Sequence, residues 1–234
     1  MARDGTDEQL RAMTLATHAR PIVIAPVGRI ERRLVAWVAE DARAVLGRDV
    51  VVADGVPLPS HAFSRQRDQW RAAGILDALA DAKRADWLRL LGIADVDLYA
   101  PDLNFVFGEA DERRGVAVFS TARLRLAAES TDRLRRRAAI EAIHELGHTF
   151  GLRHCSRPSC VMWFSNTLAE TDRKDVSPCA EHARELARAR RQRVGSASRI
   201  GVPHDQGDSG RAAESRYTSW ISTPSDFSVA RGGK

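Results

Sequence analysis

The chain has 234 residues, of which 44% are apolar and 29% are charged, and its formal net charge is +5. These values describe one compact soluble domain with some excess length. Three cysteines are too few for the two-bridge framework of small secreted folds, so reduced thiols or metal ligands are the better interpretation.

The sequence contains no candidate membrane or secretion segment. No run approaches the roughly 18 apolar residues that a bilayer span needs, so we expect no membrane contact. The first twenty residues carry charges throughout, which does not fit a signal peptide, and we place the protein in the cytoplasm. Only three of the 36 basic residues are lysine, which indicates an arginine-favouring coding bias, so nucleic acid is not an expected partner.

The first half of the sequence alternates strand and helix patterns. Residues 21–27 are a short β-branched run, residues 29–46 repeat apolar side chains at helical spacing, and residues 50–56 again resemble a strand. Residues 68–82 return to helical spacing after a proline-containing loop. This order predicts a mixed α/β layer.

Three further strand-like stretches follow, at residues 96–99, 103–107 and 115–120, with a charged turn between the last two. A sheet of about five strands is therefore expected before the next helix. After residue 193 the composition becomes rich in Gly, Ser and charged residues. We therefore predict a leader at 1–20, a folded domain at 21–193 and a flexible tail at 194–234.

The segment HELGHTFGLRHC, at residues 144–155, carries the chemistry. His144 and His148 are four residues apart on a predicted helix, so both imidazoles can bind one cation, while Glu145 lies beside them as a candidate general base. A catalytic zinc site usually has three protein ligands and one open position. His154 can be the third ligand if the chain turns at Gly151, which tolerates the left-handed conformation. The spacing is the metzincin signature.

A second cluster of metal-ligand residues follows directly. Cys155 and Cys160 are separated by four residues, and Cys179 and His182 by two. This spacing favours a closed structural zinc site with four ligands, distinct from the catalytic zinc. Unpaired buried thiols and a Cys155–Cys160 disulfide are the alternatives.

These motifs together resemble the archaemetzincins, whose pattern is HExxHxxGxxHC-x4-C-x-M followed by a CxxC pair. Cys155, Cys160 and Met162 match this pattern. Two features depart from it, because His182 replaces the last cysteine and only sixteen residues separate Met162 from Cys179. The resemblance implies a mixed, mostly parallel five-stranded sheet of metzincin type. It also implies an active-site helix and a smaller C-terminal helical subdomain that carries zinc.

The resemblance also implies roles for single residues. Glu145 would act as base and acid in peptide-bond hydrolysis by a zinc-bound water, and Met162 would be the Met-turn residue beneath the metal. Residues 103–108 would be the edge strand that pairs with extended substrate. Aminopeptidase activity is mildly favoured, which requires an acidic group for the substrate amine. Nearby candidates are Glu109, Asp111 and Glu112.

Two other functions remain open. One is a zinc-binding scaffold with little or no turnover, against which the presence of Glu145 argues. The other is a nucleic-acid binder that uses the Cys3His site and a basic helix, whose arginines are Arg184, Arg188, Arg190, Arg191 and Arg193. A monomer is the favoured oligomeric state.

Overall fold

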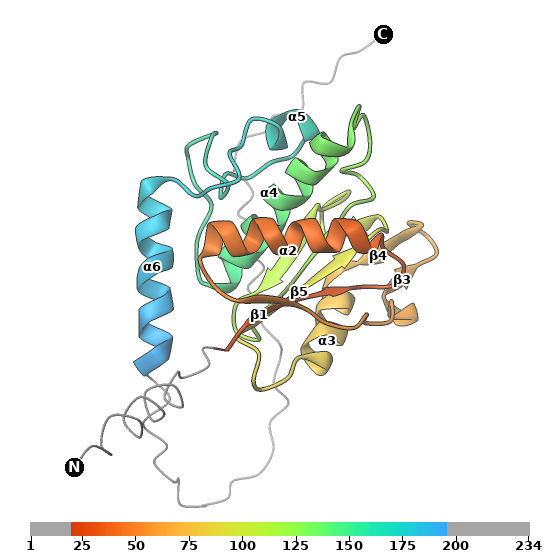
Figure 1. The fold of residues 1–234 in the computed structure, drawn as a ribbon. Helices are drawn as coiled ribbons and strands as arrows, with labels where there is room; N and C mark the ends of the chain where they lie inside the picture. Colours follow the sequence, from red (N-terminus) through yellow and green to blue (C-terminus); the bar gives the residue numbers. More distant parts are fainter. Residues whose placement is uncertain (1–19, 196–234) are drawn as a thin grey trace, which may run out of the picture.

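The computed structural model describes residues 20–195 (Figure 1). The predicted leader, apart from Arg20, and nearly all of the predicted tail lie outside these residues. Among them, no helix is both long and apolar enough to cross a membrane.

A five-stranded sheet forms the centre of the molecule, in the order β2-β1-β5-β8-β7. Its strands are β1 (Ile22–Pro26), β2 (Val50–Val52), β5 (Arg89–Ala94), β7 (Gly108–Asp111) and β8 (Val116–Ser120). All neighbouring pairs are parallel except β7 and β8, which are antiparallel. The predicted class, a mixed and mostly parallel five-stranded sheet, is confirmed.

Two of the five strands were wrongly predicted. Residues 103–107 form no strand, and residues 96–99 contribute only β6 (Leu98–Tyr99), which belongs to a second sheet. Their places are taken by β5 and β7. Every residue of β5 is buried, so its sequence lacks the alternation that identifies half-buried strands. β7 lies at the edge of the sheet, where strands often carry polar or charged residues. Its sequence, GEAD, is therefore easily mistaken for a turn.

Helices cover both faces of the sheet (Figure 1). Helices α2 (Arg32–Leu46) and α4 (Thr131–Thr149) pack on one face, and α3 (Ala72–Ala82) packs on the other. The side chains of β1 alternate accordingly, since Ile22 and Ile24 contact the first core and Val23 contacts the second. Both α2 and α3 begin later than the periodicity predicted, and part of the expected α3 is the short strand β4 (Gln69–Arg71).

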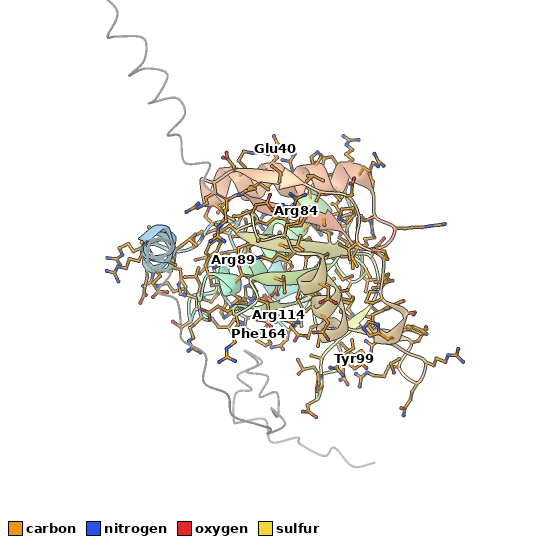
Figure 2. All side chains as sticks on the ribbon, turned by 90° about the horizontal axis from the view of Figure 1, so that it is seen from below. Glu40, Arg84, Arg89, Tyr99, Arg114 and Phe164 are labelled. Atoms are coloured by element: carbon orange, nitrogen blue, oxygen red, sulfur yellow. The ribbon has the colours of Figure 1, made fainter. Side chains whose placement is uncertain are left out.

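Helix α4 is held in place at both of its ends. Ser130 caps its N-terminus by accepting a hydrogen bond from the backbone N–H of Arg133. At the other end, Arg89 of β5 lies inside the molecule (Figure 2) and donates from Nε to the carbonyl of Thr149 at 3.0 Å. Its guanidinium also stacks over the ring of Phe150. The C-terminal turn of α4 is thus fixed against the central strand.

The remaining elements are short or peripheral. A second sheet contains β3 (Phe63–Ser64), β4 and β6, and a 3-10 turn, η1 (Ser60–Ala62), precedes it. The chain after α4 contains α5 (Leu168–Thr171) and then α6 (Ala180–Gly195), which stands beside the body of the molecule (Figure 1). This part of the chain carries the second cluster of metal-ligand residues.

Candidate metal centre and active-site cavity

The three histidines of the first motif come together at the end of α4. His144 and His148 occupy successive turns of the helix, and their Nε2 atoms are 3.1 Å apart. His154, on the chain after the helix, stacks against His144 with ring centroids 5.4 Å apart. One ligand atom from each of the three lies within 4.8 Å of the other two.

Hydrogen bonds determine which ring nitrogen of each helical histidine is free. The Nδ1 of His144 lies 2.8 Å from the carbonyl of Val161, and the Nδ1 of His148 lies 2.8 Å from that of Leu152. A carbonyl only accepts, so each Nδ1 carries the proton and donates it. Both Nε2 atoms therefore present lone pairs to the same point, which is the arrangement found around histidine-bound metals.

The protonation states also suit a metal. Burial holds the pKa of His144 well below its usual value, and burial lowers the pKa values of His148 and His154 to about 4. The imidazoles are therefore neutral at pH 7, as ligands must be. Two nitrogens of a tetrahedral zinc ion are roughly 3.3 Å apart, close to the 3.1 Å observed between the Nε2 atoms of His144 and His148. The donor set fits zinc.

Two local features give the metal-ligand segment its shape. Gly151 has a φ of +89°, so the predicted left-handed turn that brings His154 back is present. Met162 is fully buried below the helix, and a Cβ added at Gly147 would lie 2.5 Å from its sulfur. The thioether therefore packs against the backbone of α4 between the two helical histidines.

Glu145 lies between α4 and the edge strand β7. Its carboxyl is buried beside Gly108, where an added Cβ would be 2.6 Å from Oε1. Burial, and then the charge of Glu141, raise the pKa of Glu145 well above its usual value, while the charge of Lys174 opposes this shift. Glycine at position 108 leaves the space that this carboxyl occupies.

These groups face one cavity of about 280 Å³. Its walls come from the segment before β7, from β7 itself, from α4 and from the chain after Met162. Its lining residues are Ala100, Leu103, Asn104, Phe105, Val106, Phe107, Gly108, Glu109, Ala110, Glu141, His144, Glu145, His148, His154, Phe164, Ser165, Asn166 and Lys174. The cavity therefore joins the histidine cluster, Glu145 and the sheet edge.

The second cluster also assembles as predicted. The distances are 4.0 Å between the sulfurs of Cys155 and Cys179, 4.0 Å from the sulfur of Cys160 to Nδ1 of His182, and 3.3 Å from that of Cys179 to the same Nδ1. A disulfide needs sulfurs about 2.05 Å apart, and all three cysteines are free. Ligands of a tetrahedral zinc ion are roughly 3.3 to 3.8 Å apart, so this cluster fits zinc too.

A hydrogen bond also fixes the ring of His182, but in the reverse sense to His144 and His148. Its Nε2 donates to the carbonyl of Arg153 at 3.0 Å, which leaves Nδ1 free to bind a metal. Burial opposes ionisation of Cys179, but the hydrogen bond from the backbone N–H of His182 and the contact between the sulfur and its ring outweigh it and lower the pKa of this thiol to about 6. Burial raises the pKa of Cys160 to about 11. A thiolate is thus already favoured at Cys179.

Comparison with known proteins adds to this geometry. The model of Peptidase family M54 matches residues 31–188. The archaemetzincin of Pyrococcus furiosus is 38% identical over 176 residues, covering 70% of this chain and 91% of the relative. The chain belongs to peptidase family M54. It is therefore an archaemetzincin-family zinc metallopeptidase, and the predicted family is confirmed.

Other archaemetzincins are also similar to this chain, in sequence and in structure. That of Methanopyrus kandleri is 44% identical over 140 residues, covering 60% of this chain and 78% of the relative. Its crystal structure superposes with a TM-score of 0.68 at 37% identity, covering 75% of this chain and 98% of that one. The archaemetzincin of Archaeoglobus fulgidus, solved in complex with malonate, gives 0.63 at 33% identity, covering 70% and 99%.

The edge strand of this archaemetzincin is not the one that the sequence suggested. Residues 103–108 were expected, but β7 is the last strand of the sheet and only Gly108 is shared. The backbone N–H of Ser120 donates to the carbonyl of Phe107, and the antiparallel ladder then directs the backbone groups of Gly108 and Ala110 away from β8. The free edge therefore lies along the cavity.

The three acidic candidates for an amine-binding group have different surroundings. Glu109 lines the cavity, and its Oε2 is buried without a hydrogen-bond partner among the described residues. Asp111 instead accepts from Arg114 at 2.7 Å. Glu112 lies next to Gly151, where an added Cβ would be 3.1 Å from its Oε1. Of these three acidic residues, only Glu109 lines the cavity.

Glu141, Ser165 and Lys174 are cavity residues that were not singled out from the sequence, and Gly108 was named only as the end of the expected edge strand. Glu141 could have been found, because it lies four residues before Glu145 and so on the same face of α4. Lys174 is one of only three lysines, yet it is 1% exposed. No local pattern marks Gly108 or Ser165.

Proposed function

We propose that this chain hydrolyses peptide bonds with zinc held by His144, His148 and His154 and with Glu145 as the proton-transfer group. One observation carries the proposal. Two neutral imidazoles direct free Nε2 atoms at one point, in a cavity that Glu145 also lines. That combination serves metal-assisted hydrolysis, and family membership supports a peptide as the substrate.

Bound zinc supplies a Lewis acid, which lowers the pKa of a water towards about 7 and polarises the scissile carbonyl. Glu145 accepts the proton that the attacking water loses, at the carboxylate beside Gly108, and then transfers it to the leaving amine. The free backbone groups of Gly108 and Ala110 hold the substrate in an extended conformation by pairing with its peptide groups. The buried position of Glu145 keeps bulk water from competing for its proton.

We further propose that Cys155, Cys160, Cys179 and His182 hold a second, structural zinc. Four protein ligands leave no open position for substrate, so this ion stabilises the fold and takes no part in the reaction. Met162 acts as an apolar floor beneath the catalytic site, as a Met-turn residue would. The contact between its sulfur and the backbone at Gly147 supports this role.

Aminopeptidase activity is the more specific form of the proposal. It is supported by Glu109, whose carboxyl lines the cavity with one unpartnered oxygen. Because burial raises the pKa of Glu109 to about 7, a bound ammonium group would favour its ionised form. Peptides that differ only by an acetylated N-terminus test this specificity, since an aminopeptidase cleaves only the free form.

We also propose a catalytic domain at 21–193, a cytoplasmic location and a monomeric state. A catalytic domain at 21–193 contains the whole range matched by the family model. A cytoplasmic location and a monomeric state agree with the reduced cysteines and with the metal sites, which use ligands from one chain only.

Glu145→Gln tests the mechanism directly. The amide keeps the shape of the side chain but cannot accept the proton, so we expect hydrolysis of an unbiased peptide library to fall by at least 100-fold with unchanged zinc content. Glu129→Gln, at an exposed carboxylate, is the matched control and retains full activity. Equal turnover by Glu145→Gln and wild type would contradict the proposal. Absence of turnover in both would instead favour the scaffold.

A nucleic-acid function rests on the arginines of α6. Arg184 and Arg188 are exposed, while the side chains of Arg190, Arg191 and Arg193 lie outside the described residues. A steep decrease of DNA or RNA binding with salt would favour this alternative over a peptidase.

A further inference from the structure

We propose that Ser165 and Lys174 form a carboxylate-binding subsite in the wall of the active-site cavity. This subsite would select peptides that present either a C-terminal carboxylate or an acidic side chain. That the ligand is a peptide rests on the proposed peptidase function. That the subsite binds a carboxylate rests on the geometry of the cavity wall.

Ser165 provides the first observation. Its hydroxyl is buried and has no hydrogen-bond partner among the described residues, and the residue lines the cavity. A buried hydroxyl normally finds a partner, because leaving it unpaired forfeits the hydrogen bonds that it makes in water. An acceptor that enters the cavity would satisfy it.

Lys174 provides the second observation. The residue is 1% exposed, and its Nζ donates to Oε1 of Glu141 at 3.2 Å and to the carbonyl of Trp163 at 3.3 Å. An ammonium group has three hydrogens, so these two bonds leave one available. Trp163 is two residues before Ser165, which places this ammonium next to the chain segment that carries the free hydroxyl. Both spare groups can donate a hydrogen bond to a ligand.

The donor groups of this wall favour an anion over a neutral acceptor. Lys174 and Glu141 form a buried ion pair, and the carboxyl groups of Glu109 and Glu145 line the same cavity. The zinc ion of the proposed function adds two positive charges to this cavity. A carboxylate can accept from Ser165 and Lys174 at once, and such charge-assisted bonds are about twice as strong as neutral ones.

The ion pair of Lys174 and Glu141 needs no ligand to be stable, and it determines where the ammonium group lies. Thr171, the last residue of α5, also donates to Glu141, at 3.4 Å. The carboxylate of Glu141 is therefore held by both Thr171 and Lys174. Lys174 is thereby fixed at the cavity wall, and a ligand meets a preoriented ammonium group. Preorientation lowers the entropic cost of binding.

Binding is measured in the Glu145→Gln background, so that peptides are not consumed. Two pairs are titrated calorimetrically: one peptide with a free or an amidated C-terminus, and an amidated peptide with Glu or Gln at one position. We expect the charged member of at least one pair to bind roughly tenfold more tightly. The pair that shows the preference identifies the source of the carboxylate.

Ser165→Ala is the decisive variant, because it removes a hydroxyl without a protein partner among the described residues and should leave the melting temperature unchanged. We expect it to reduce the preference several-fold. Ser60→Ala, at an exposed serine, is the control and leaves the preference intact. Lys174→Met would strand Glu141, so it is combined with Glu141→Gln, and this double variant should abolish the preference.

Three outcomes separate the subsite from the proposed function. Equal binding within both pairs overturns the subsite, whatever the activity of the wild type. A preference that survives in Ser165→Ala and in the double variant also overturns it, since the carboxylate is then bound elsewhere, as by the metal. A preference lost in these variants supports the subsite, even if the wild type cleaves no peptide and the proposed function fails.

Discussion

Substitution of Gly108 by alanine is expected to separate activity from stability. The added Cβ would lie 2.6 Å from Oε1 of Glu145 and 2.7 Å from both its Cδ and Cγ. Such short distances essentially never occur between a Cβ and a non-bonded carbon or oxygen atom. The variant can form only if the Glu145 side chain moves.

The size of this movement gives the expected effect. Ordinary van der Waals contact begins at about 3.4 Å, so the carboxyl must shift by roughly 0.8 Å or more. A misplacement of about 1 Å in a catalytic group costs on the order of 100-fold in rate, or about 2.7 kcal/mol of activation free energy. The fold changes little, because the atoms that yield belong to a side chain and not to the backbone.

The assay is the rate constant kcat on a cleaved peptide, together with the zinc content and the melting temperature. We expect kcat to fall about 100-fold while zinc and melting temperature stay close to wild type. Gly55→Ala is the control, because its added Cβ would meet Pro26 at an ordinary 3.5 Å. A Gly108→Ala protein with wild-type kcat would refute the assignment of Glu145, as the base could then not occupy this position.

The remaining predictions concern metal and pH. His182→Ala should lower the zinc content from two ions per chain to one by atomic emission and destabilise the fold, whereas His182→Cys should keep both ions; two ions in His182→Ala would contradict the Cys3His assignment. Asp172→Asn should lower the free energy of unfolding by about 2 kcal/mol at pH 7, because buried Arg137 loses a bidentate partner at 2.7 Å. The hydrogen bond from Arg137 lowers the pKa of Asp172 below its usual 3.8, so this stabilisation is present above pH 4 and disappears as the pH falls through the folded-state pKa. Urea unfolding at pH 7 and pH 3 measures the difference, which should shrink at the lower pH.

The strands were predicted well where a pattern was local. Strands β1, β2 and β8 lie within three predicted ranges, because their β-branched runs are bounded by polar residues. The central strand β5 was missed, although it contacts both β1 and β8. Burial on both faces removes the alternation on which such predictions depend. The edge strand β7 was missed because its residues form a strand only by pairing with β8.

The site shows a similar division. Helical spacing and one turn are enough to bring the residues of the first motif together, so the sequence alone indicated this cluster. Its members are His144, Glu145, His148 and His154. The sequence also indicated the second cluster, whose ligands come from two short spacings. The contacts of Gly108 with Glu145 and of Lys174 with Glu141 join segments that are far apart along the chain, and no spacing rule relates them.

The sequence by itself therefore indicated the family, the proposed metal-ligand residues and the proposed base, since zinc chemistry limits residue types and spacings to a few patterns. Tertiary structure alone decided which strand is the free edge, which hydrogen bonds fix the imidazole tautomers, and which polar groups line the cavity wall. Those features depend on how separate segments pack in three dimensions. Residues that are distant along the chain are brought into contact by burial of the two hydrophobic cores, which leaves no local signal.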